Sequence, residues 1–390
     1  MRRLAAAAAL VLAGCTAATP LGPPSVPGAT GGPADAGPDP PLELATVGTG
    51  FEGPVLAIAP AGDDRILVVE QHGLIRVLQP DGTIPPVHFA DLRARVSDDG
   101  TERGLLSLAF HPQDPARAFV AYTDWADHLV VAEFSVVEGR LDDGSGRRLL
   151  RVRQPSQFHN GAMLQFGPEG YLYVSVGDGG GIGDPWGHAQ DPTTPHGSIL
   201  RIWVDGPRPW AAHPANPFLA DGHPAVWLHG LRNPWRFWID PVAGLVHIGD
   251  VGQFFREELT IVPLDAPGAN LGWPIMEARA CYEADTCDTD GLVLPDIAYD
   301  HDAHPDRPGC AIQAGPVYRG AAMPALRGTA FYGDFCGGWV RSFRVEGGEV
   351  VDDREVVTRV GVLRSFGLDG DGEILVVTGE GEVLRIVESD

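Results

Sequence analysis

A histidine and an aspartate stand at the two ends of one predicted β-hairpin, where they could work as a proton-transfer pair. Residues 157–181 read QFHNGAMLQFGPEGYLYVSVGDGGG, with alternating apolar residues on either side of a Pro-Glu-Gly turn. This pattern predicts two antiparallel strands joined by a tight turn. His159 precedes the first strand and Asp178 follows the second, so the imidazole and the carboxylate share one end of the hairpin.

Charged and amide side chains occupy corresponding positions in other predicted hairpins. Arg232 and Asn233 precede one first strand, Glu102 precedes another, and Arg364 precedes the last. A base, a carboxylate partner and fixed positive charges suit an enzyme that removes a proton while it stabilises a growing anion. The sequence therefore indicates a candidate site where these hairpin ends meet.

Each of the central residues also has a purely structural interpretation. His159 could cap a strand, Asp178 could be a turn residue, and Arg232 could pair with one of the many acidic neighbours. Three such coincidences at one end of a repeated unit are less common than one. The pattern therefore favours a functional site.

The elements that carry these side chains recur along the chain. Each unit has an apolar strand, a turn rich in Pro, Gly or Asp, a second strand, and one or two more. One unit cannot bury both of its faces, so the units must stack. Six units predict an all-β, six-bladed β-propeller with four-stranded antiparallel blades around a central channel, whereas a β-sandwich would need fewer strands. The units are residues 55–78, 105–124, 157–181 with 196–204, 234–253, 315–345 and 365–387.

The composition excludes some classes of function. A hydrophobic content of 44% over 390 residues excludes global disorder. The formal net charge of −24 opposes binding to nucleic acid, which requires clustered basic side chains, and to an anionic membrane surface. Small neutral or cationic ligands remain compatible with this charge.

The N-terminus predicts export rather than a folded element. Residues 1–15 combine two arginines, an apolar run too short to span a bilayer, and small residues before Cys15. The sequence LAGC resembles the bacterial lipobox, which predicts lipidation of Cys15; an ordinary secretory signal is the alternative. Residues 16–41, rich in Pro, Gly and Ala, predict a disordered tether, and 42–390 the catalytic propeller. We therefore expect an exported protein that faces the periplasm or exterior and contacts a membrane only through its lipid anchor.

The other four cysteines predict disulfides. They are an even number in an oxidising compartment and allow three pairings. We predict Cys281–Cys287, which closes a short loop, and Cys310–Cys336, which would tie one hairpin to its neighbour. A zinc site is disfavoured because the chain has no C-x₂-C pair.

From about residue 45 onward, the order of the motifs resembles that of a known family. The resemblance is to the soluble glucose/sorbosone dehydrogenases, and in particular to their aldose sugar dehydrogenase branch. It implies a quinoprotein that uses pyrroloquinoline quinone (PQQ) and calcium to oxidise an aldose sugar at C1 to a lactone, and that passes electrons to a separate acceptor. The motifs are GLLSLAFHP, HNGAMLQFGPEGYLYVSVGDGG, GSILRI, GLRNPWRFWIDPVAGLVHIGDVGQ, NLGWPIME, YGDFC and SFGLDGDGE.

The resemblance implies three catalytic roles. His159 resembles the general base that takes the proton of the anomeric hydroxyl. Asp178 resembles the carboxylate that orients and charges that imidazole. Arg232 resembles the group that faces the quinone oxygen on which charge develops.

The resemblance also implies residues that bind the cofactor or metals. The calcium at the quinone would take backbone carbonyls from a turn, and a second, structural calcium would take an acidic ligand. The cofactor or substrate residues are Glu102, Asn233 and Arg364, the turn is Gly252-Gln253, and the acidic ligand is Glu258.

The chain departs from the family pattern at two cofactor positions. Cys336 stands where the glucose enzymes have a lysine for a PQQ carboxylate, and a second arginine is missing near Val362. Three carboxylates need positive partners, so we expect that this chain binds PQQ more weakly or through other positive residues.

Two other functions compete with the dehydrogenase. A non-catalytic binding propeller of the hedgehog-interacting type shares the domain, but the presence of His159, Asp178 and Arg232 together favours the enzyme. A lactone-hydrolysing calcium propeller would need several acidic ligands in the channel. The sequence does not name the sugar, but aromatic residues of loops at the mouth could stack on sugar rings. These are Trp186, Trp210, Trp227 and Tyr282.

Overall fold

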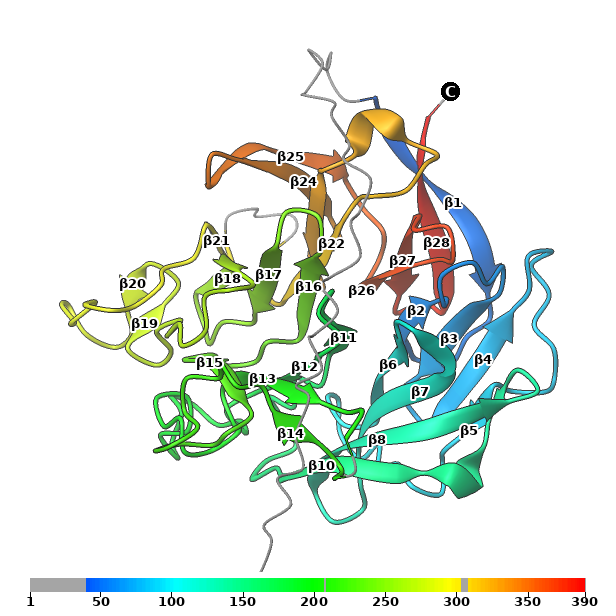
Figure 1. Ribbon diagram of the computed structural model, residues 1–390. Helices are drawn as coiled ribbons and strands as arrows, with labels where there is room; N and C mark the ends of the chain where they lie inside the picture. The colour runs from blue at the N-terminus through cyan, green and yellow to red at the C-terminus, as the bar shows by residue number, and fades with distance from the viewer. Residues whose placement is uncertain (1–39, 207, 303–307, 390) are drawn as a thin grey trace, which may run out of the picture. The chain divides into compact units, whose positions relative to one another are not determined.

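The computed structural model describes residues 40–206, 208–302 and 308–389, which form six antiparallel blade sheets arranged in a ring and one separate two-stranded sheet (Figure 1). The predicted six-bladed, all-β propeller is confirmed. Two short 3₁₀ helices, Asp143–Ser145 and Pro324–Leu326, interrupt the strands. Within the described ranges no helix is long and apolar enough to cross a membrane. Cys15, the predicted signal segment 1–15 and the predicted tether as far as residue 39 lie outside the described residues.

Each blade is built mainly from consecutive strands of the chain. Blade 1 contains β2 (Pro54–Ile58), β3 (Ile66–Glu70), β4 (Leu74–Leu78) and β5 (Ala90–Asp91). Blade 2 contains β6 (Leu105–His111), β7 (Asp114–Thr123), β8 (His128–Val137) and β10 (Arg147–Arg153), with β9 (Arg140–Leu141) beside β8. Blade 3 contains β11 (Leu164–Phe166), β12 (Leu172–Val176), β13 (Ser198–Trp203) and β14 (Ala211–Ala212), with β15 (Val226–His229) also beside β13.

The second half of the ring follows the same plan. Blade 4 contains β16 (Arg236–Asp240), β17 (Leu245–Asp250), β18 (Arg256–Pro263) and β21 (Ile297–Asp300), with the hairpin β19 (Met276–Glu277) and β20 (Ala280–Cys281) between the last two. Blade 5 contains β22 (Ile312–Val317), β23 (Ala330–Asp334), β24 (Val340–Glu346) and β25 (Glu349–Val357). Blade 6 contains β26 (Leu363–Leu368), β27 (Ile374–Thr378), β28 (Glu382–Glu388) and β1 (Leu42–Thr49).

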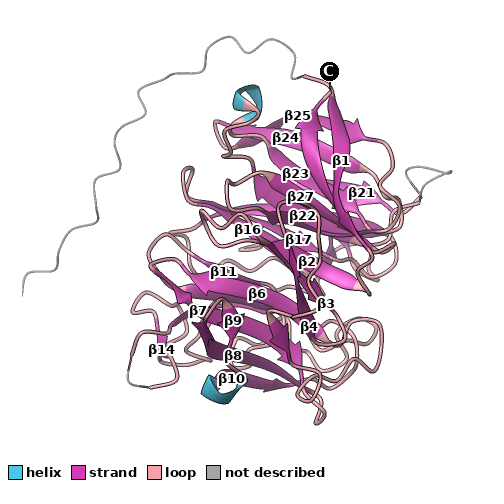
Figure 2. Cartoon of the chain, turned by 90° about the vertical axis from the view of Figure 1, so that its right-hand side faces the viewer, coloured by secondary structure: helices cyan, strands magenta, loops and turns pink. Residues whose placement is uncertain are grey.

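The ring is closed by a strand from the other end of the chain. β1 pairs antiparallel with β28, with Leu42 opposite Glu388, and so completes blade 6. The first strands of neighbouring blades contact each other in order around the ring, including β26 with β2. Figure 2 shows the strands of blade 2 side by side in one sheet, from a direction turned by 90°.

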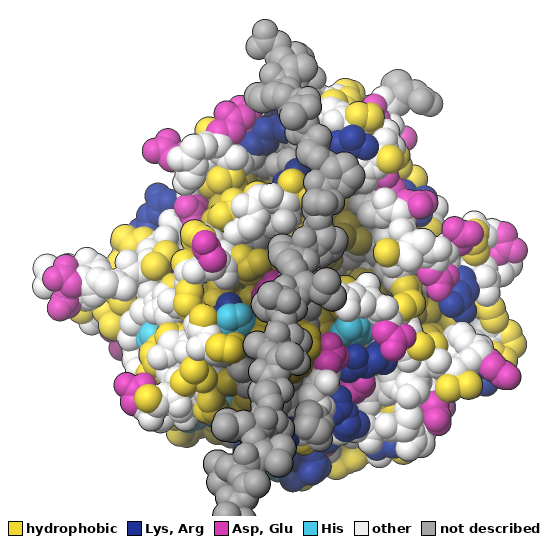
Figure 3. Space-filling view, in the orientation of Figure 1, with side chains coloured by type: hydrophobic (Ala, Val, Ile, Leu, Met, Phe, Trp, Pro, Cys, Tyr) yellow, Lys and Arg dark blue, Asp and Glu magenta, His cyan; other side chains and the backbone are white. Residues whose placement is uncertain are grey.

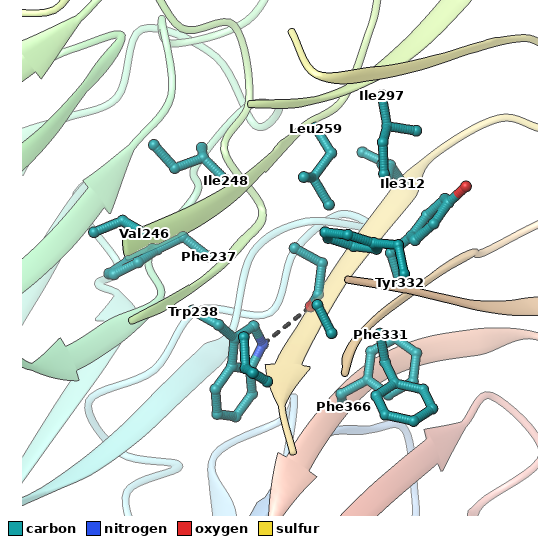
Figure 4. Close-up of a cluster of buried hydrophobic side chains, with 14 of the residues drawn as sticks. Phe237, Trp238, Val246, Ile248, Leu259, Ile297, Ile312, Phe331, Tyr332 and Phe366 are labelled. Atoms are coloured by element: carbon teal, nitrogen blue, oxygen red, sulfur yellow. Dashed lines mark hydrogen bonds between the residues drawn. The ribbon is translucent and has the colours of Figure 1, made fainter. Parts of the chain in front are cut away.

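Apolar side chains fill the space between neighbouring blades. Figure 4 shows one such cluster, which contains Phe237 of blade 4 and in which Phe331 of blade 5 lies beside Phe366 of blade 6. The indole N–H of Trp238 donates to the Ala314 carbonyl at 3.0 Å, so the polar atom of this buried ring is satisfied. Because both faces of a blade are covered, this packing holds the strand ends in place.

In four blades, a side chain at the end of the second strand binds the segment that leads into the first strand, called here the lead-in segment. The side-chain oxygen accepts a hydrogen bond from a backbone N–H of that segment, and so joins the two at one end of the channel. The pairs are Glu70 with Glu52, Thr123 with Gly104, Asp250 with Arg232 and Asn233, and Asp334 with Cys310 and Ala311.

On the face drawn in Figure 3, the visible acidic side chains are not gathered at one place. On the face drawn in Figure 3, Asp and Glu lie mainly around the edge, with basic side chains among them. Positive and negative groups therefore alternate over the described part of this face, although the whole chain carries a net charge of −24.

Candidate active site

A cavity of about 490 Å³ lies where the lead-in segments of the blades meet. It collects most of the residues that the sequence singles out, while Asp178 and Glu258 are buried and do not line it. Apolar and aromatic side chains, including Trp235 and Phe335, complete the lining. A groove of about 640 Å³ lies near Pro60–Arg65, away from these residues. The predicted residues that line the cavity are Glu102, His159, Arg232, Asn233, Gly252, Gln253 and Arg364.

His159 and Asp178 form a buried hydrogen-bonded pair. The Nδ1 atom of His159 lies 2.6 Å from Oδ1 of Asp178. The same carboxylate accepts hydrogen bonds from the N–H of Gly180 at 2.8 Å and from the indole N–H of Trp273 at 2.9 Å. An ionised carboxylate accepts only, so the ring proton sits on Nδ1 and Nε2 is left as the basic atom. Because His159 lines the cavity, the pair can take a proton from a molecule bound there.

The backbone of His159 is held in an unusual conformation. Its φ is +56°, in the left-handed region that costs a non-glycine residue free energy. Its N–H donates to Oε2 of Glu102 at 2.7 Å. A side chain on Gly177 would approach the His159 carbonyl oxygen to 2.1 Å, so only glycine fits there. Blade 2 and the end of β12 thus fix the backbone that presents the imidazole.

Arg232 projects into the cavity without an acidic partner. Its Nη1 donates to the Val251 carbonyl at 2.7 Å, its Nε lies 3.4 Å from Oε1 of Gln253, and its guanidinium lies 5.7 Å from the centre of the Trp273 ring. Among the described residues no carboxylate lies within ion-pair distance of it. The structural interpretation of Arg232 as half of an ion pair is therefore wrong, and its charge is available to an anion.

Trp273 contacts both Asp178 and Arg232. Sequence reasoning gave it no role. The ring is buried, donates to Asp178, lies beside Arg232, and packs edge-on against Tyr282 with 4.9 Å between ring centres. It belongs to the long segment between β18 and β21, which has no strand periodicity. The sequence signal was an isolated tryptophan before proline in the motif NLGWPIME, which points to no specific contact.

Arg364 and Gln313 give the cavity further polar atoms that lack partners. Nη2 of Arg364 donates to Oε1 of Gln71 at 2.5 Å, but its Nε is buried without an acceptor, as Oε1 of Gln313 is without a donor. Burial lowers the pKa of Arg364. A group with several carboxylates, such as PQQ, fits a cavity that presents two guanidinium groups without acidic partners.

Carboxylates lie at and near the turn predicted to bind calcium. Oε1 of Glu277 accepts hydrogen bonds from the four successive N–H groups of residues 253–256, so this carboxylate fixes the turn predicted to bind calcium. Glu258 pairs with Asp250 across β17 and β18, and burial together with the charge of the other carboxylate raises the pKa of Glu258. Two buried carboxyls suit a cation.

A ready-made cluster of metal ligands is not seen there. In the described parts of the chain, one group of three ligand-type side chains has its ligand atoms within 4.8 Å, namely Cys310, Asp334 and Cys336. Both cysteines of that group are in a disulfide. Calcium at the 252–253 turn would therefore depend on backbone oxygens.

Both predicted disulfides are present. Cys281 is bonded to Cys287, and Cys310 to Cys336, each with 5.6 Å between Cα atoms. The second bridge joins the lead-in segment and the far end of one hairpin, β22–β23, rather than two neighbouring hairpins as expected. Cys310 lines the cavity, so this bridge fixes part of its wall.

Two of the four aromatic residues proposed to stack on sugars lie elsewhere. Trp227 is completely buried against Tyr173 in the core, and Trp210 packs on His223 beside the apolar cluster of blades 2 and 3. For these two residues the alternative to sugar stacking, packing within the protein, is therefore confirmed. Trp186 is 45% exposed, and Tyr282 contacts Trp273 at the site.

Known proteins share both the sequence pattern and the fold. The chain is 28% identical to the uncharacterized protein slr1608 of Synechocystis, over 89% of this chain and 87% of that protein. It is 31% identical to mouse hedgehog-interacting protein over 57% of this chain, and 25% identical to HIPL1 of Arabidopsis thaliana over 84%. The matched regions span 34% of the first of these two relatives and 60% of the second.

Solved structures with the same fold include two aldose sugar dehydrogenases. The PQQ-bound enzyme from Streptomyces coelicolor has a TM-score of 0.70 at 22% identity and is matched over 89% of this chain and 99% of its own. The soluble apo-form from Escherichia coli has a TM-score of 0.75 at 20% identity, over 89% and 100%. The family model described as Glucose / Sorbosone dehydrogenase matches residues 51–385. With most of its length matched, this chain belongs to the glucose/sorbosone dehydrogenase family.

Proposed function

We propose that this protein is a PQQ- and calcium-dependent dehydrogenase that oxidises an aldose sugar at C1 to a lactone and passes the electrons to a separate acceptor. The observation that carries the proposal is the His159–Asp178 pair, whose imidazole lines a cavity together with guanidinium groups that have no acidic partners. This arrangement combines a base with fixed positive charge, as removal of a proton from a hydroxyl requires.

The chain's own residues supply the acid–base chemistry. When bound, PQQ supplies the two-electron acceptor for the hydride that leaves the sugar carbon. Nε2 of His159 takes the hydroxyl proton as the carbonyl of the lactone forms. Asp178 holds the imidazole by Nδ1 and stabilises the imidazolium that results. Trp273 and the Gly180 N–H keep that carboxylate in place.

Other residues of the cavity would hold the cofactor. Arg232 and Arg364 would bind its carboxylates or the oxygen on which negative charge develops. Asn233, whose side chain is fixed by Glu102 at 3.1 Å, would hydrogen-bond the same group. Backbone oxygens of Gly252-Gln253 would contact calcium, and Glu258 would serve a second ion.

A non-catalytic propeller is the alternative, because hedgehog-interacting proteins are among the relatives. The two functions differ in one assay. Purified apoprotein is mixed with PQQ and Ca²⁺, and dye reduction is followed over a panel of aldoses. We expect PQQ-dependent turnover with at least one aldose. PQQ binding without turnover on any aldose, or no PQQ binding, would contradict the proposal and favour a binding propeller.

The location of the enzyme is part of the same proposal. Lipidation of Cys15 would hold it on the outer side of a bacterial membrane, with the propeller beyond a tether. We expect Cys15→Ser to release the protein from membranes or block its processing. A soluble unaltered protein whose mature N-terminus lies elsewhere would contradict the anchor.

A further inference from the structure

A third arginine lies behind the wall of the cavity. Arg236, the first residue of β16, is completely buried. Its Nη2 donates to the Val55 carbonyl of blade 1 at 2.7 Å, and its Nη1 donates to the Trp235 carbonyl at 3.0 Å. Blades 1 and 4 stand opposite each other in the six-membered ring, so this side chain crosses the channel.

Arg236 is adjacent to the cavity without being exposed in it. Its guanidinium carbon lies 4.6 Å from the ring centre of Trp235, which lines the cavity. Its Nε has no hydrogen-bond partner. The charge of Arg364, which also lines the cavity, adds to burial in lowering the pKa of Arg236 to about 9, which still leaves it protonated at neutral pH.

Three positive charges therefore surround one cavity without an acidic partner. The hydrogen bonds that the guanidinium groups of Arg232, Arg236 and Arg364 donate all go to carbonyl or amide oxygens, and no carboxylate among the described residues forms an ion pair with any of them. Elsewhere in this acidic chain partners are common, as for Arg319 with Asp240. A buried charge without a partner is costly, so an anion in the cavity would relieve all three.

Among the described residues that line the cavity, Arg232 and Arg364 are the permanent side-chain cations. The chain contains no lysine, so its basic side chains other than histidine are all arginines. The family pattern places a lysine and a second arginine near the cofactor carboxylates, and Cys336 stands at the lysine position, bonded to Cys310. A cofactor with three carboxylates would therefore need a positive charge from another element of the fold.

We propose that Arg236 supplies this charge from behind the cavity wall, so that three guanidinium groups balance the three carboxylates of the cofactor. The inference rests on the proposed function in naming PQQ as the anion. Arg236 then acts on affinity through its charge and does not contact the ligand. A purely structural role, in which the side chain only ties blade 1 to blade 4, predicts different behaviour when the charge is kept.

The test compares Arg236→Met with Arg236→Lys in the full-length apoprotein. PQQ binding is measured by calorimetry, and the rise in melting temperature on adding PQQ gives a second readout. We expect Arg236→Met to weaken PQQ binding about tenfold, the effect of one charge acting through protein of intermediate dielectric constant. Arg236→Lys keeps the charge and should bind within about threefold of the unaltered protein.

Arg201→Met is the matched control. Arg201 is a buried arginine of β13 with one nitrogen unpartnered, and it lies outside the cavity. Its loss should lower the melting temperature without changing the PQQ dissociation constant. Unchanged PQQ binding in Arg236→Met would overturn the inference, and so would equal losses in the Met and Lys variants.

A second probe separates this inference from the proposed function. Benzene-1,3,5-tricarboxylate carries three carboxylates but no quinone. If the unaltered protein binds this probe with the same dependence on Arg236 but does not bind PQQ, the inference stands and the proposed cofactor is wrong. If it binds neither anion, the inference is overturned as well.

Discussion

Blades 3 and 5 place an aspartate at the same position and use it differently. Asp334 at the end of β23 accepts hydrogen bonds from backbone N–H groups of its own lead-in segment, at 2.9 Å from Cys310 and 3.1 Å from Ala311. Asp178, just after β12, accepts instead from the imidazole of His159 and the indole of Trp273. The same place in the blade thus serves structure in one case and presents a side chain for chemistry in the other.

The difference arises from a neighbouring blade. In blade 3 the N–H of His159 is bound by Glu102, which comes from the lead-in segment of blade 2. This contact replaces the bond that an aspartate makes within blades 4 and 5, and Asp178 is left free to bind side chains. The aspartate at this position of blade 3 is available for chemistry because Glu102 already binds the backbone N–H of the lead-in segment.

The largest expected effect comes from replacing the two aspartates separately. Asp178→Asn should lower kcat by about 10²–10³-fold, because the imidazolium loses its charged partner. Asp334→Asn should leave turnover per folded molecule nearly unchanged but cost about 1–3 kcal/mol, because an amide nitrogen would face backbone donors. Turnover and the free energy of unfolding are measured on the same preparations. Equal effects of the two changes on turnover would break the comparison.

The disulfides should differ in their effect on stability. Cys310 and Cys336 are 26 residues apart, whereas Cys281 and Cys287 are 6 apart. Replacing both cysteines of the larger loop by serine should cost about 3 kcal/mol, and replacing those of the smaller loop about 2 kcal/mol. Urea unfolding of the two double variants checks this order. A reversed order would show that strain or residual structure outweighs loop closure.

Trp273→Phe sharpens the assignment of Asp178. The change removes the N–H that Asp178 accepts and keeps an aromatic ring beside Arg232. We expect kcat to fall about tenfold, the worth of one hydrogen bond to a charged group. Trp227→Phe is the control, since that buried indole N–H has no partner. Equal loss of kcat in both variants would assign Trp273 to packing alone.

His247, a histidine outside the site, should make the free energy of unfolding depend on pH. Burial lowers the pKa of His247 to about 4, and neither ring nitrogen has a partner. Below about pH 6.5 the unfolded chain takes up a proton on His247 and the folded chain does not. The contribution of neutral His247 to the free energy of unfolding is therefore fully present above that pH. It then falls by up to about 1.4 kcal/mol per pH unit as the pH drops toward 4.

His247→Phe removes this contribution and keeps a ring against Phe343. The variant should therefore lose less stability than the unaltered protein between pH 7 and pH 5. Unfolding free energies at the two pH values give the result. An unchanged difference would show that His247 is already protonated in the folded state.

The sequence predicted the fold well because each blade is local. Strands, turns and spacing recur in six units, so the stacking and the shared end of His159 and Asp178 followed from the pattern. β1 was not foreseen as a strand of blade 6, because its partner lies at the other end of the chain. Arg236 was read as part of a strand motif, and its place across the channel depends on the opposite blade. Contacts that join distant segments were therefore the part that the sequence did not reveal.

The most direct test of the account is the turnover of PQQ-loaded His159→Gln, measured with its melting temperature on one preparation. The imidazole lines the cavity rather than the core between blades, so the variant should fold and bind PQQ while kcat falls by about 10²–10⁴-fold. In the double variant with Asp178→Asn, the two losses should be far from additive because the residues act as a unit. If His159 only caps a strand, stability should drop by about 0.5–3 kcal/mol and turnover per folded molecule should be unchanged. Normal turnover in the PQQ-loaded variant would contradict the catalytic assignment.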